Sequence, residues 1–342
     1  MDITSLDLAG TEDLLLSFGE PSYRAKQVMR WIYGGLAKSF RDMTDLPAQT
    51  RKKLDGAASF SSVIEINHLA SRNGATKALL ILEDGNTIET ALLPSSKAGG
   101  YTACVSSQVG CPVGCCFCVT GNQGFKRNLS VAEIVDQVLY FARRLEQECR
   151  IMNIVFMGMG EPLANYDNVI EAIKRFNAPW GLALRARSIT ISTVGLVPGI
   201  EKLAKEEIQV GLAVSLHAAD DKLRTQLVPI NKKYPLVKLM PAVRQYIKAT
   251  GRRVSFEYCL IDSINDGLNH ARALAHLIQG MNVHVNLISM NPGCSGYNKP
   301  KPKKIIYFKN ELEKLGINTT LRRSYGTDIE AACGQLKSRE LL

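Results

Sequence analysis

The sequence lacks any apolar run that approaches the roughly eighteen residues of a membrane-spanning helix. It also lacks the basic start and following apolar stretch of a signal peptide, since acidic side chains are spread through the opening MDITSLDLAGTEDLLLSFGE. Both absences predict a cytoplasmic protein with no membrane partner. In that setting, nine cysteines indicate metal or redox chemistry rather than a disulfide framework.

The chain has no excess of acidic residues. It carries 42 Lys and Arg against 32 Asp and Glu, a formal net charge of +10, which favours a polyanionic partner such as nucleic acid. Taken singly, each basic cluster is more typical of a solvated face, whereas together the clusters could follow a phosphate backbone. These clusters are Arg51-Lys52-Lys53, Lys126-Arg127, Arg185 with Arg187, Lys232-Lys233, Arg252-Arg253, 299–304 and Arg322-Arg323.

The densest cysteine motif lacks a fourth ligand. Cys111, Cys115 and Cys118 have the spacing C-x3-C-x2-C, and thiolates on such a loop can converge on one soft metal centre. A structural zinc site or an electron-transfer [4Fe–4S] cluster takes four protein ligands, so three cysteines leave one iron open to a substrate. Zinc with a distant fourth ligand, or buried thiols acting as small hydrophobes, are the alternatives. Cys116 falls outside the spacing and has no assigned role.

Apolar periodicity divides the chain into three regions. Residues 1–60 indicate a small basic helical module, which could pack as a lid or present its cations to RNA. Residues 61–96 contain three strand-like runs, separated by turn signals at Gly74 and at 84–86, and we expect a small antiparallel sheet. Residues 97–342 alternate strand and helix patterns in roughly six units, which predicts a parallel sheet, doubly wound or curled toward a barrel.

In this third region the expected elements follow one another closely. The predicted strands are 101–106, 153–157, 188–192, 209–216, 254–261, 283–289 and 318–323. The predicted helices are 130–148, 166–176, 198–205, 220–226, 236–249, 267–279 and 304–315. Ser130 and Glu133 form a capping box that starts the first of these helices.

Polar residues recur where these strands end, and function in parallel βα folds gathers at that end. They are the cysteine loop, Gly158-Met159-Gly160-Glu161-Pro162, Ser192-Thr193, Ser215-Leu216-His217 and Asn291-Pro292. The carboxylate of Glu161 beside bare glycine backbone could hold an amino-acid ammonium group, although an isolated motif of this kind is more typical of a tight turn. Ser192 or His217 alone would be ordinary core residues, so it is their shared position that predicts one site.

Two further cysteines are candidates for chemistry. Cys333 lies between Ala and Gly near the end of the sequence, where it is sterically open and could act as a fourth ligand, a nucleophile or a redox partner. Cys104, just before the cysteine loop, is the second candidate. The alternative for each is an inert buried thiol, and we expect that state for Cys149, Cys259 and Cys294.

At this point the sequence closely resembles the radical S-adenosylmethionine (SAM) superfamily and, within it, the RlmN/Cfr family of RNA adenosine methyltransferases. The resemblance covers nearly the whole chain and implies a partial (β/α)6 barrel with an N-terminal helical module and a small antiparallel extension. The matching stretches are CVSSQVGC (104–111), GMGEPLANYDNV (158–169), ITISTVG (189–195), SLHA (215–218), VNLISMNP (285–292) and DIEAACGQL (328–336).

Finer features resemble the RlmN branch, which methylates C2 of adenosine, more than the Cfr branch, which methylates C8 of the same rRNA adenosine. Pro162 follows the motif glutamate where Cfr-type proteins usually carry Ala, and Val109 stands where they carry Cys. Two departures, Cys116 and Met290, remove no functional group. A rival interpretation from a different class is a non-catalytic Fe–S or zinc RNA-binding protein.

The resemblance also implies roles for individual residues. Cys111, Cys115 and Cys118 would hold a [4Fe–4S] cluster, and two SAM molecules would be used per turnover. Cys333 would carry a methyl group, Glu89 would take the C2 proton, and Cys104 would release the product through a disulfide with Cys333. Without the resemblance, Glu89 reads as an exposed strand residue. The implied SAM contacts are Gly160, Glu161, Ser192, Ser215, Leu216, His217 and Asn291.

The partners that the resemblance implies are 23S rRNA, near the peptidyl-transferase centre, and tRNA, at the adenosine 3′ to the anticodon. A flavodoxin- or ferredoxin-type protein would supply the electron. We expect a monomeric enzyme.

Overall fold

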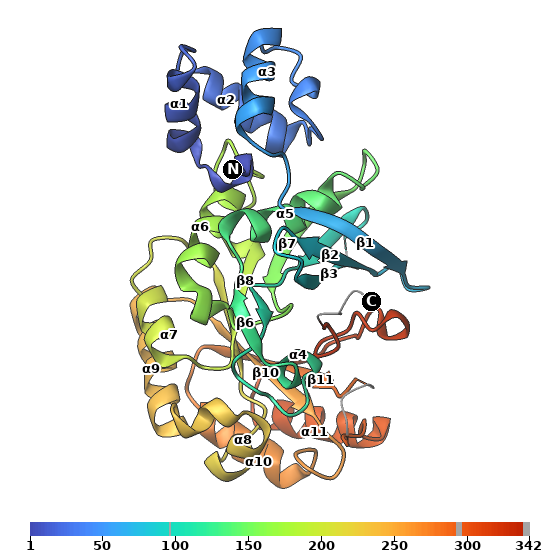
Figure 1. Ribbon diagram of the computed structural model, residues 1–342. Helices are drawn as coiled ribbons and strands as arrows, with labels where there is room; N and C mark the ends of the chain where they lie inside the picture. The colour runs from blue at the N-terminus through green and yellow to red at the C-terminus, as the bar shows by residue number, and fades with distance from the viewer. Residues whose placement is uncertain (96, 292–295, 338–342) are drawn as a thin grey trace.

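The computed structural model describes residues 1–95, 97–291 and 296–337 (Figure 1). The first region forms the expected helical module at one end of the molecule. Its helices are α1 (Leu8–Ser17), α2 (Arg24–Met29) with a π-helical continuation at Arg30–Gly34, and α3 (Ala48–Ala57). Helix α1 begins where the side chain of Asp7 accepts a hydrogen bond from the N–H of Gly10 at 2.7 Å.

This module is packed against the outer helices of the sheet. Arg175, on α6 (Tyr166–Asn177), donates hydrogen bonds to the carbonyls of Thr4 at 2.6 Å and Ser5 at 2.8 Å. Tyr33 meets Trp180 edge to face, with ring centroids 5.9 Å apart. Buried residues of the module and of the sheet belong to one continuous core. The module and the sheet therefore share one packed interior.

A single ten-stranded sheet organises the rest of the chain, in the order β1-β2-β3-β4-β7-β8-β9-β10-β11-β12. Its antiparallel strands are β1 (Val63–Ala70), β2 (Thr76–Leu82) and β3 (Thr87–Pro94), and β3 pairs with β4 (Gly100–Cys104). The antiparallel strands expected from the sequence are therefore present, but they extend the main sheet instead of forming a separate one.

From β4 onward every pairing in this sheet is parallel. The strands are β7 (Arg150–Phe156), β8 (Ile189–Thr193), β9 (Gly211–Ser215), β10 (Val254–Leu260), β11 (Val283–Ser289) and β12 (Thr319–Leu321). Among the described residues no pairing joins β1 to β12, so the sheet is open. The α/β class is confirmed, and the successive parallel strands with intervening helices correspond to the partial barrel.

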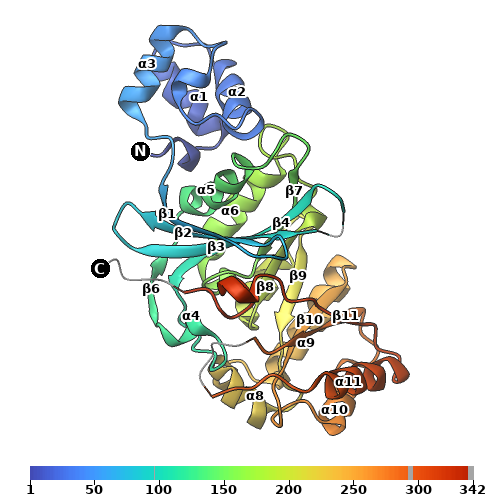
Figure 2. The same cartoon turned by 90° about the vertical axis from the view of Figure 1, so that its right-hand side faces the viewer.

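Helices cover the outside of the parallel strands (Figures 1 and 2). They are α5 (Val131–Ala142), α6, α7 (Val197–Leu203), α8 (Asp221–Leu227), α9 (Leu236–Thr250), α10 (Leu268–Ile278) and α11 (Pro302–Lys314). The capping box of Ser130 and Glu133 is present at the start of α5. That helix ends six residues before the expected Glu148. The N–H groups of Arg144 and Leu145 bond to the carbonyls three residues earlier, as in a 3₁₀ turn, and the α-helical pattern stops there.

The last described segment returns to the antiparallel strands. In both views the C-terminal chain, in red, runs beside β1–β3 and passes the mouth of the parallel sheet. Ser71, in the turn between β1 and β2, donates to the carboxylate of Asp328 at 2.5 Å, and Asn73 accepts from the N–H of Gly326 at 3.2 Å. The segment 326–337 is thus held by residues more than 250 positions away in the sequence.

Candidate active site

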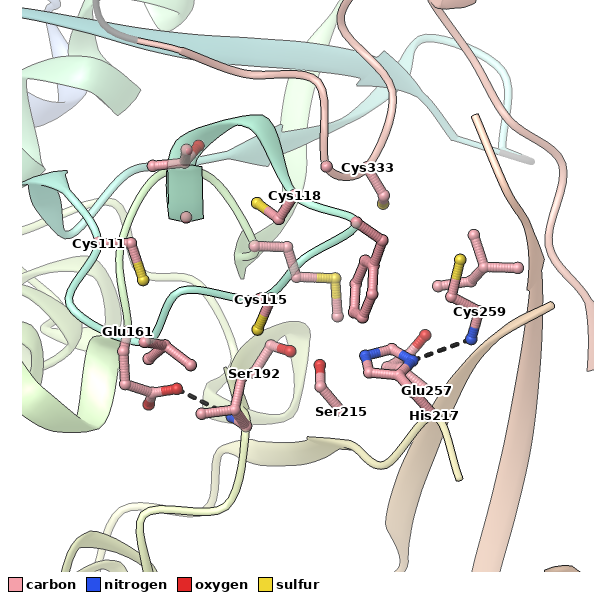
Figure 3. Close-up of a pocket in the computed structure, with 18 of the residues that line it drawn as sticks. Cys111, Cys115, Cys118, Glu161, Ser192, Ser215, His217, Glu257, Cys259 and Cys333 are labelled. Atoms are coloured by element: carbon pink, nitrogen blue, oxygen red, sulfur yellow. Dashed lines mark hydrogen bonds between the residues drawn. The ribbon is translucent and has the colours of Figure 1, made fainter. Parts of the chain in front are cut away.

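One cavity lies at the carboxyl ends of the parallel strands, as the strand-end pattern predicts (Figure 3). It encloses about 970 Å³ of empty space, counting the part open to solvent, which is enough for a small-molecule ligand. The predicted residues that line it are Cys111, Cys115, Cys118, Gly160, Glu161, Ser192, Ser215, His217, Asn291 and Cys333. None of its described lining residues comes from residues 1–60, so the helical module is not a lid over this cavity.

The cysteine loop is held open by a two-stranded hairpin that the sequence did not indicate. Its strands are β5 (Gln108–Gly110) and β6 (Phe125–Asn128), with the short helix α4 (Val119–Asn122) between them. The N–H of Cys111 donates to the carbonyl of Gly124 at 2.7 Å. Gly110 has φ +75, and a Cβ there would meet that same carbonyl oxygen at 2.0 Å. Only glycine fits at this end of the loop.

The three thiols of the motif point toward the cavity from this loop (Figure 3). Burial raises the pKa of Cys111 to about 12 and raises the pKa of Cys115 as well, and neighbouring thiols act in the same direction. Thiols so enclosed stay protonated unless a cation takes the place of the proton, and a bound metal does this. The chemistry of the donor set therefore suits an iron–sulfur group.

The sulfurs do not converge on one point. Among the described residues, no three Cys, His, Asp or Glu side chains form a group placed to hold a single metal ion. The cysteines that the spacing predicts for an iron–sulfur centre are nevertheless present together in one cavity. A [4Fe–4S] cluster takes each thiolate at a different iron atom, so its ligands have to line one cavity rather than meet. Three cysteines in one cavity fit that requirement.

Cys116 has a partner outside the cluster motif. A hydrogen bond between its thiol and the hydroxyl of Tyr297 raises the pKa of Tyr297 to about 12. The N–H of Cys116 donates to the carbonyl of Leu227 at 3.2 Å. Cys116 therefore ties the cysteine loop to the end of α8 and to Tyr297, which gives a structural role to a thiol that the spacing left unexplained.

The glycine-rich turn after β7 places Glu161 against the cavity wall. Gly160 has φ +99, and a Cβ there would come within 2.6 Å of the side chain of Gln108. The carboxylate of Glu161 accepts hydrogen bonds from the N–H groups of Leu163 at 3.0 Å and Val194 at 2.8 Å. Burial nevertheless raises the pKa of Glu161 to about 7. The motif is thus a tight turn and a carboxylate site at once.

His217 is fixed as a neutral hydrogen-bond donor. Its Nδ1 accepts from the N–H of Cys259 at 3.0 Å, which leaves the proton on Nε2. Burial lowers the pKa of His217 to about 3, and the charge of Arg224 lowers it further. The ring of Phe117 packs edge to face on the imidazole, with centroids 4.7 Å apart. Ser192 and Ser215 direct their hydroxyls into the cavity beside this ring.

Two further residues with sequence-based expectations lie near this cavity, and the implied SAM contact of Leu216 stays a prediction. Leu216 is fully buried in the main core and is not among the cavity-lining residues, and its N–H donates to the carbonyl of Glu257. Cys259, expected as an inert buried thiol, is buried but lines the cavity, and its backbone orients His217. Cys149 is half-buried and outside this cavity, whereas Cys294 lies outside the described residues.

Cys333 enters the cavity on the returning C-terminal segment. The side chain of Asn291 donates to the carbonyl of Cys333 at 3.1 Å, and the N–H of Val119 donates to that of Gly334 at 2.8 Å. The thiol is accessible from the cavity although protein atoms enclose it. This enclosure raises the pKa of Cys333, and the guanidinium of Arg322 acts in the opposite direction.

Cys104 and Glu89 stand behind this segment and do not line the cavity. Cys104 is packed with Ala91 and Ala331, and its pKa is raised to about 12, chiefly by burial and also by the charge of Cys333. Glu89, expected to be exposed, is only 1% exposed. Tertiary packing buries it because the C-terminal segment covers β3.

Two charged residues at the cavity, Glu257 and Arg322, were not predicted from the sequence to belong to the site. Glu257, on β10, lines the cavity and accepts hydrogen bonds from Asn286 at 2.8 Å and from Arg322 at 3.3 Å. Its only signal was one acid inside the apolar run VSFEYCLI. Arg322 was grouped with the basic clusters that could follow a phosphate backbone, yet it lies between Glu257 and Met157.

An open, mainly parallel α/β sheet with a three-cysteine loop after its first parallel strand defines a radical SAM protein. Residues 105–275 match the family described as the Radical SAM superfamily. Residues 1–60 match the Ribosomal RNA large subunit methyltransferase N-terminal domain.

Similar proteins identify the family within this superfamily to which the chain belongs. Two proteins named probable dual-specificity RNA methyltransferase RlmN are similar, from Syntrophomonas wolfei (46% identity, 98% of this chain and 97% of the relative) and Pelotomaculum thermopropionicum (47%, 99% and 92%). The crystal structure of a radical SAM methyltransferase from Sphaerobacter thermophilus has a TM-score of 0.95 at 44% identity, covering 98% of this chain and 99% of that one. The chain belongs to the RlmN family of radical SAM RNA methyltransferases.

Family membership implies a [4Fe–4S] cluster and SAM as cofactors, and the three cavity cysteines are the ligands that fit the cluster. Within the described residues, no helix is both long and apolar enough to cross a membrane.

Proposed function

We propose that this chain methylates C2 of an adenosine in 23S rRNA near the peptidyl-transferase centre, and C2 of the adenosine 3′ to the anticodon in tRNA. One observation carries the proposal. Cys333 opens into the same cavity as Cys111, Cys115 and Cys118, although more than 200 residues separate it from them. Pro162 and Val109 support the choice of C2 over C8, because both resemble the RlmN branch.

The chemistry explains why a cysteine carrier is needed. Adenine C2 is an electron-poor amidine carbon and cannot attack the SAM methyl group as an ordinary nucleophile would. When bound, the cluster and SAM supply a 5′-deoxyadenosyl radical. Cys333 would carry a methyl group, taken from a first SAM, in the same cavity. Loss of one hydrogen atom to that radical would leave a carbon radical on the Cys333 sulfur, which would bond to C2 and so form the RNA–protein adduct.

Glu89 and Cys104, which the segment 326–337 separates from the cavity, complete the proposed cycle. Glu89 takes the C2 proton from the RNA–protein adduct, and the electron pair of the C–H bond stays on the adenine. The C–S bond between Cys333 and the transferred carbon then breaks as Cys104 forms a disulfide with Cys333; the Cys104 proton ends on the new methyl group, and the one electron left over would return to the cluster. Cellular thiols reduce the disulfide again. Since neither residue lines the cavity, both roles require the segment 326–337 to shift during turnover.

Several candidate RNA-contacting cations are already engaged within the helical module. Arg24 pairs with Glu20 at 2.6 Å and Arg30 with Asp45 at 2.8 Å. Lys53 donates to the carbonyl of Phe18 at 2.7 Å. Of these, only the Arg30–Asp45 pair has an exposed cation, and exposed pairs are worth little, so RNA phosphates can compete for Arg30.

The test is direct identification of the product. Anaerobically reconstituted enzyme is incubated with SAM, a reduced flavodoxin- or ferredoxin-type protein, and either a 23S rRNA fragment or tRNA, and the nucleosides are analysed by mass spectrometry and NMR. We expect 2-methyladenosine in both RNAs. Formation of 8-methyladenosine would contradict the C2 assignment, and an RNA that stays unmodified is not a substrate. RNA with guanosine at the target position is the matched control.

A further inference from the structure

A buried ion pair lies beneath the segment that carries Cys333. Lys77 on β2 and Glu89 on β3 are diagonal neighbours, since Leu79 is directly opposite Glu89 in the register. Nζ of Lys77 lies 3.1 Å from Oε1 of Glu89, and the two side chains are 2% and 1% exposed. Such a pair is costly to bury, so its position raises the question of what it does there.

Both members of the pair also hold the C-terminal segment. Nζ of Lys77 donates to the carbonyl of Glu330 at 3.1 Å, and Oε2 of Glu89 accepts from the N–H of Lys337 at 2.9 Å. Glu330 has φ +55, a left-handed conformation that turns its carbonyl toward the lysine. Cys333 lies between these two attachment points. The proposed base and the proposed methyl carrier are therefore linked through Lys77.

Removal of the Lys77 ammonium group would take away the ion pair that holds the Glu89 carboxylate. A buried carboxylate that loses a charged hydrogen-bonding partner loses both the compensation of its charge and a contact that fixes its orientation, and either loss makes it a poorer acceptor for the C2 proton. The N–H of Lys337 is the weaker support, because the segment that contains it has to shift before adenine can reach Glu89. Lys77 belongs to the sheet and stays in place when the segment moves.

We propose that Lys77 is a positioning residue for proton abstraction: its ammonium group holds the Glu89 carboxylate in place on the sheet after the segment that bears Cys333 uncovers it. This inference rests on the proposed function. The step it assists transfers one proton from adenine C2 to a Glu89 oxygen, with the C–H electron pair retained by the adduct.

The test separates proton abstraction from the earlier steps. Substrate RNA carries deuterium at C2 of the target adenosine, and three quantities are measured: methylation of Cys333, 5′-deoxyadenosine formation, and release of deuterium to solvent. For Lys77→Met we expect about tenfold or more slower deuterium release, while the first two stay within about threefold of the wild type. Lys77→Arg keeps the cation and should restore most of the release rate.

Wild-type deuterium release in Lys77→Met would overturn the inference, and so would an equal loss of all three quantities, because a mere structural brace would act on every step. Iron content and thermal melting of each variant establish that the fold and the cluster are intact. Failure of the proposed function itself looks different: the wild type would then form no methyl group on Cys333 or release no deuterium.

Discussion

The side-chain amide of Asn291 donates a hydrogen bond to the carbonyl of Cys333 at 3.1 Å. This contact ties the end of β11 to the segment that brings the thiol into the cavity. It is a local determinant of where the proposed methyl acceptor lies.

We expect Asn291→Ala to slow methylation of Cys333 by about fivefold, because loss of one such hydrogen bond costs about 1 kcal/mol and frees the carrier segment. Mass spectrometry of the tryptic peptide containing Cys333, after timed incubation with SAM, measures the rate. Asn298→Ala is a control, since that residue is outside the cavity lining. An unchanged rate would show that the other attachments of the segment suffice.

Replacement of Cys333 and of Cys104 should block the reaction at different steps. Cys333→Ala abolishes turnover, because no carrier remains for the methyl group. Cys104→Ala allows the adduct to form and traps it, since the disulfide that releases the RNA cannot close. Denaturing gels with labelled RNA measure the covalent adduct. Cys149→Ala, half-buried outside the cavity, should behave as the wild type. Free methylated RNA from Cys333→Ala would refute the carrier role.

Gly110 should be essential to the cluster loop. A Cβ at this position would meet the carbonyl oxygen of Gly124 at 2.0 Å, and its φ of +75 adds strain for any other residue. We expect Gly110→Ala to lower the iron bound per chain after reconstitution at least severalfold, measured by iron assay and visible absorption. Gly56→Ala in α3 is the matched control, because nothing lies within 4 Å of its Cβ and alanine favours a helix by about 1 kcal/mol. Full iron content in Gly110→Ala would contradict this account.

The lowered pKa of His217 predicts a defined pH dependence of stability. In the unfolded chain a histidine binds a proton near its ordinary pKa, about 6.5, whereas folded His217 does so only near pH 3. Between these values the unfolded state binds more protons, so the free energy of unfolding falls as the pH drops below about 6.5. The slope is at most about 1.4 kcal/mol per pH unit.

Replacement of this histidine should remove that slope. Thermal melts of the wild type and of His217→Asn at pH 5 and pH 8 measure it: the wild type should lose more of its stability at pH 5 than the variant. Above pH 7 the histidine is largely neutral in the unfolded chain as well as in the folded one, so the same measurement at pH 7 and 8 should show little difference in slope. An identical pH dependence in both proteins would refute a buried neutral histidine.

Much of the local structure was predictable because it depends on neighbouring residues. The turn at Asp84-Gly85-Asn86 joins β2 and β3 as expected, with Gly85 at φ +79. The capping box at Ser130 starts α5, and the C-x3-C-x2-C spacing places three thiols on one loop. The strand-end pattern also predicted the cavity, because parallel strands bring their carboxyl ends to one edge.

The amino-acid sequence alone thus determined the strands of the main sheet, the cysteine loop and the resemblance to a family, since each is carried by periodicity or by short motifs. Only the tertiary structure decided that Glu89 is buried, that Lys77 is its partner, and that Cys104 is enclosed by the segment bearing Cys333. Lys77 and Glu89 are in turn joined to residues about 250 positions away, through one carbonyl at Glu330 and one N–H at Lys337. Backbone groups look the same at every position in a sequence, so no pattern of side chains could have indicated which of them the pair would bind.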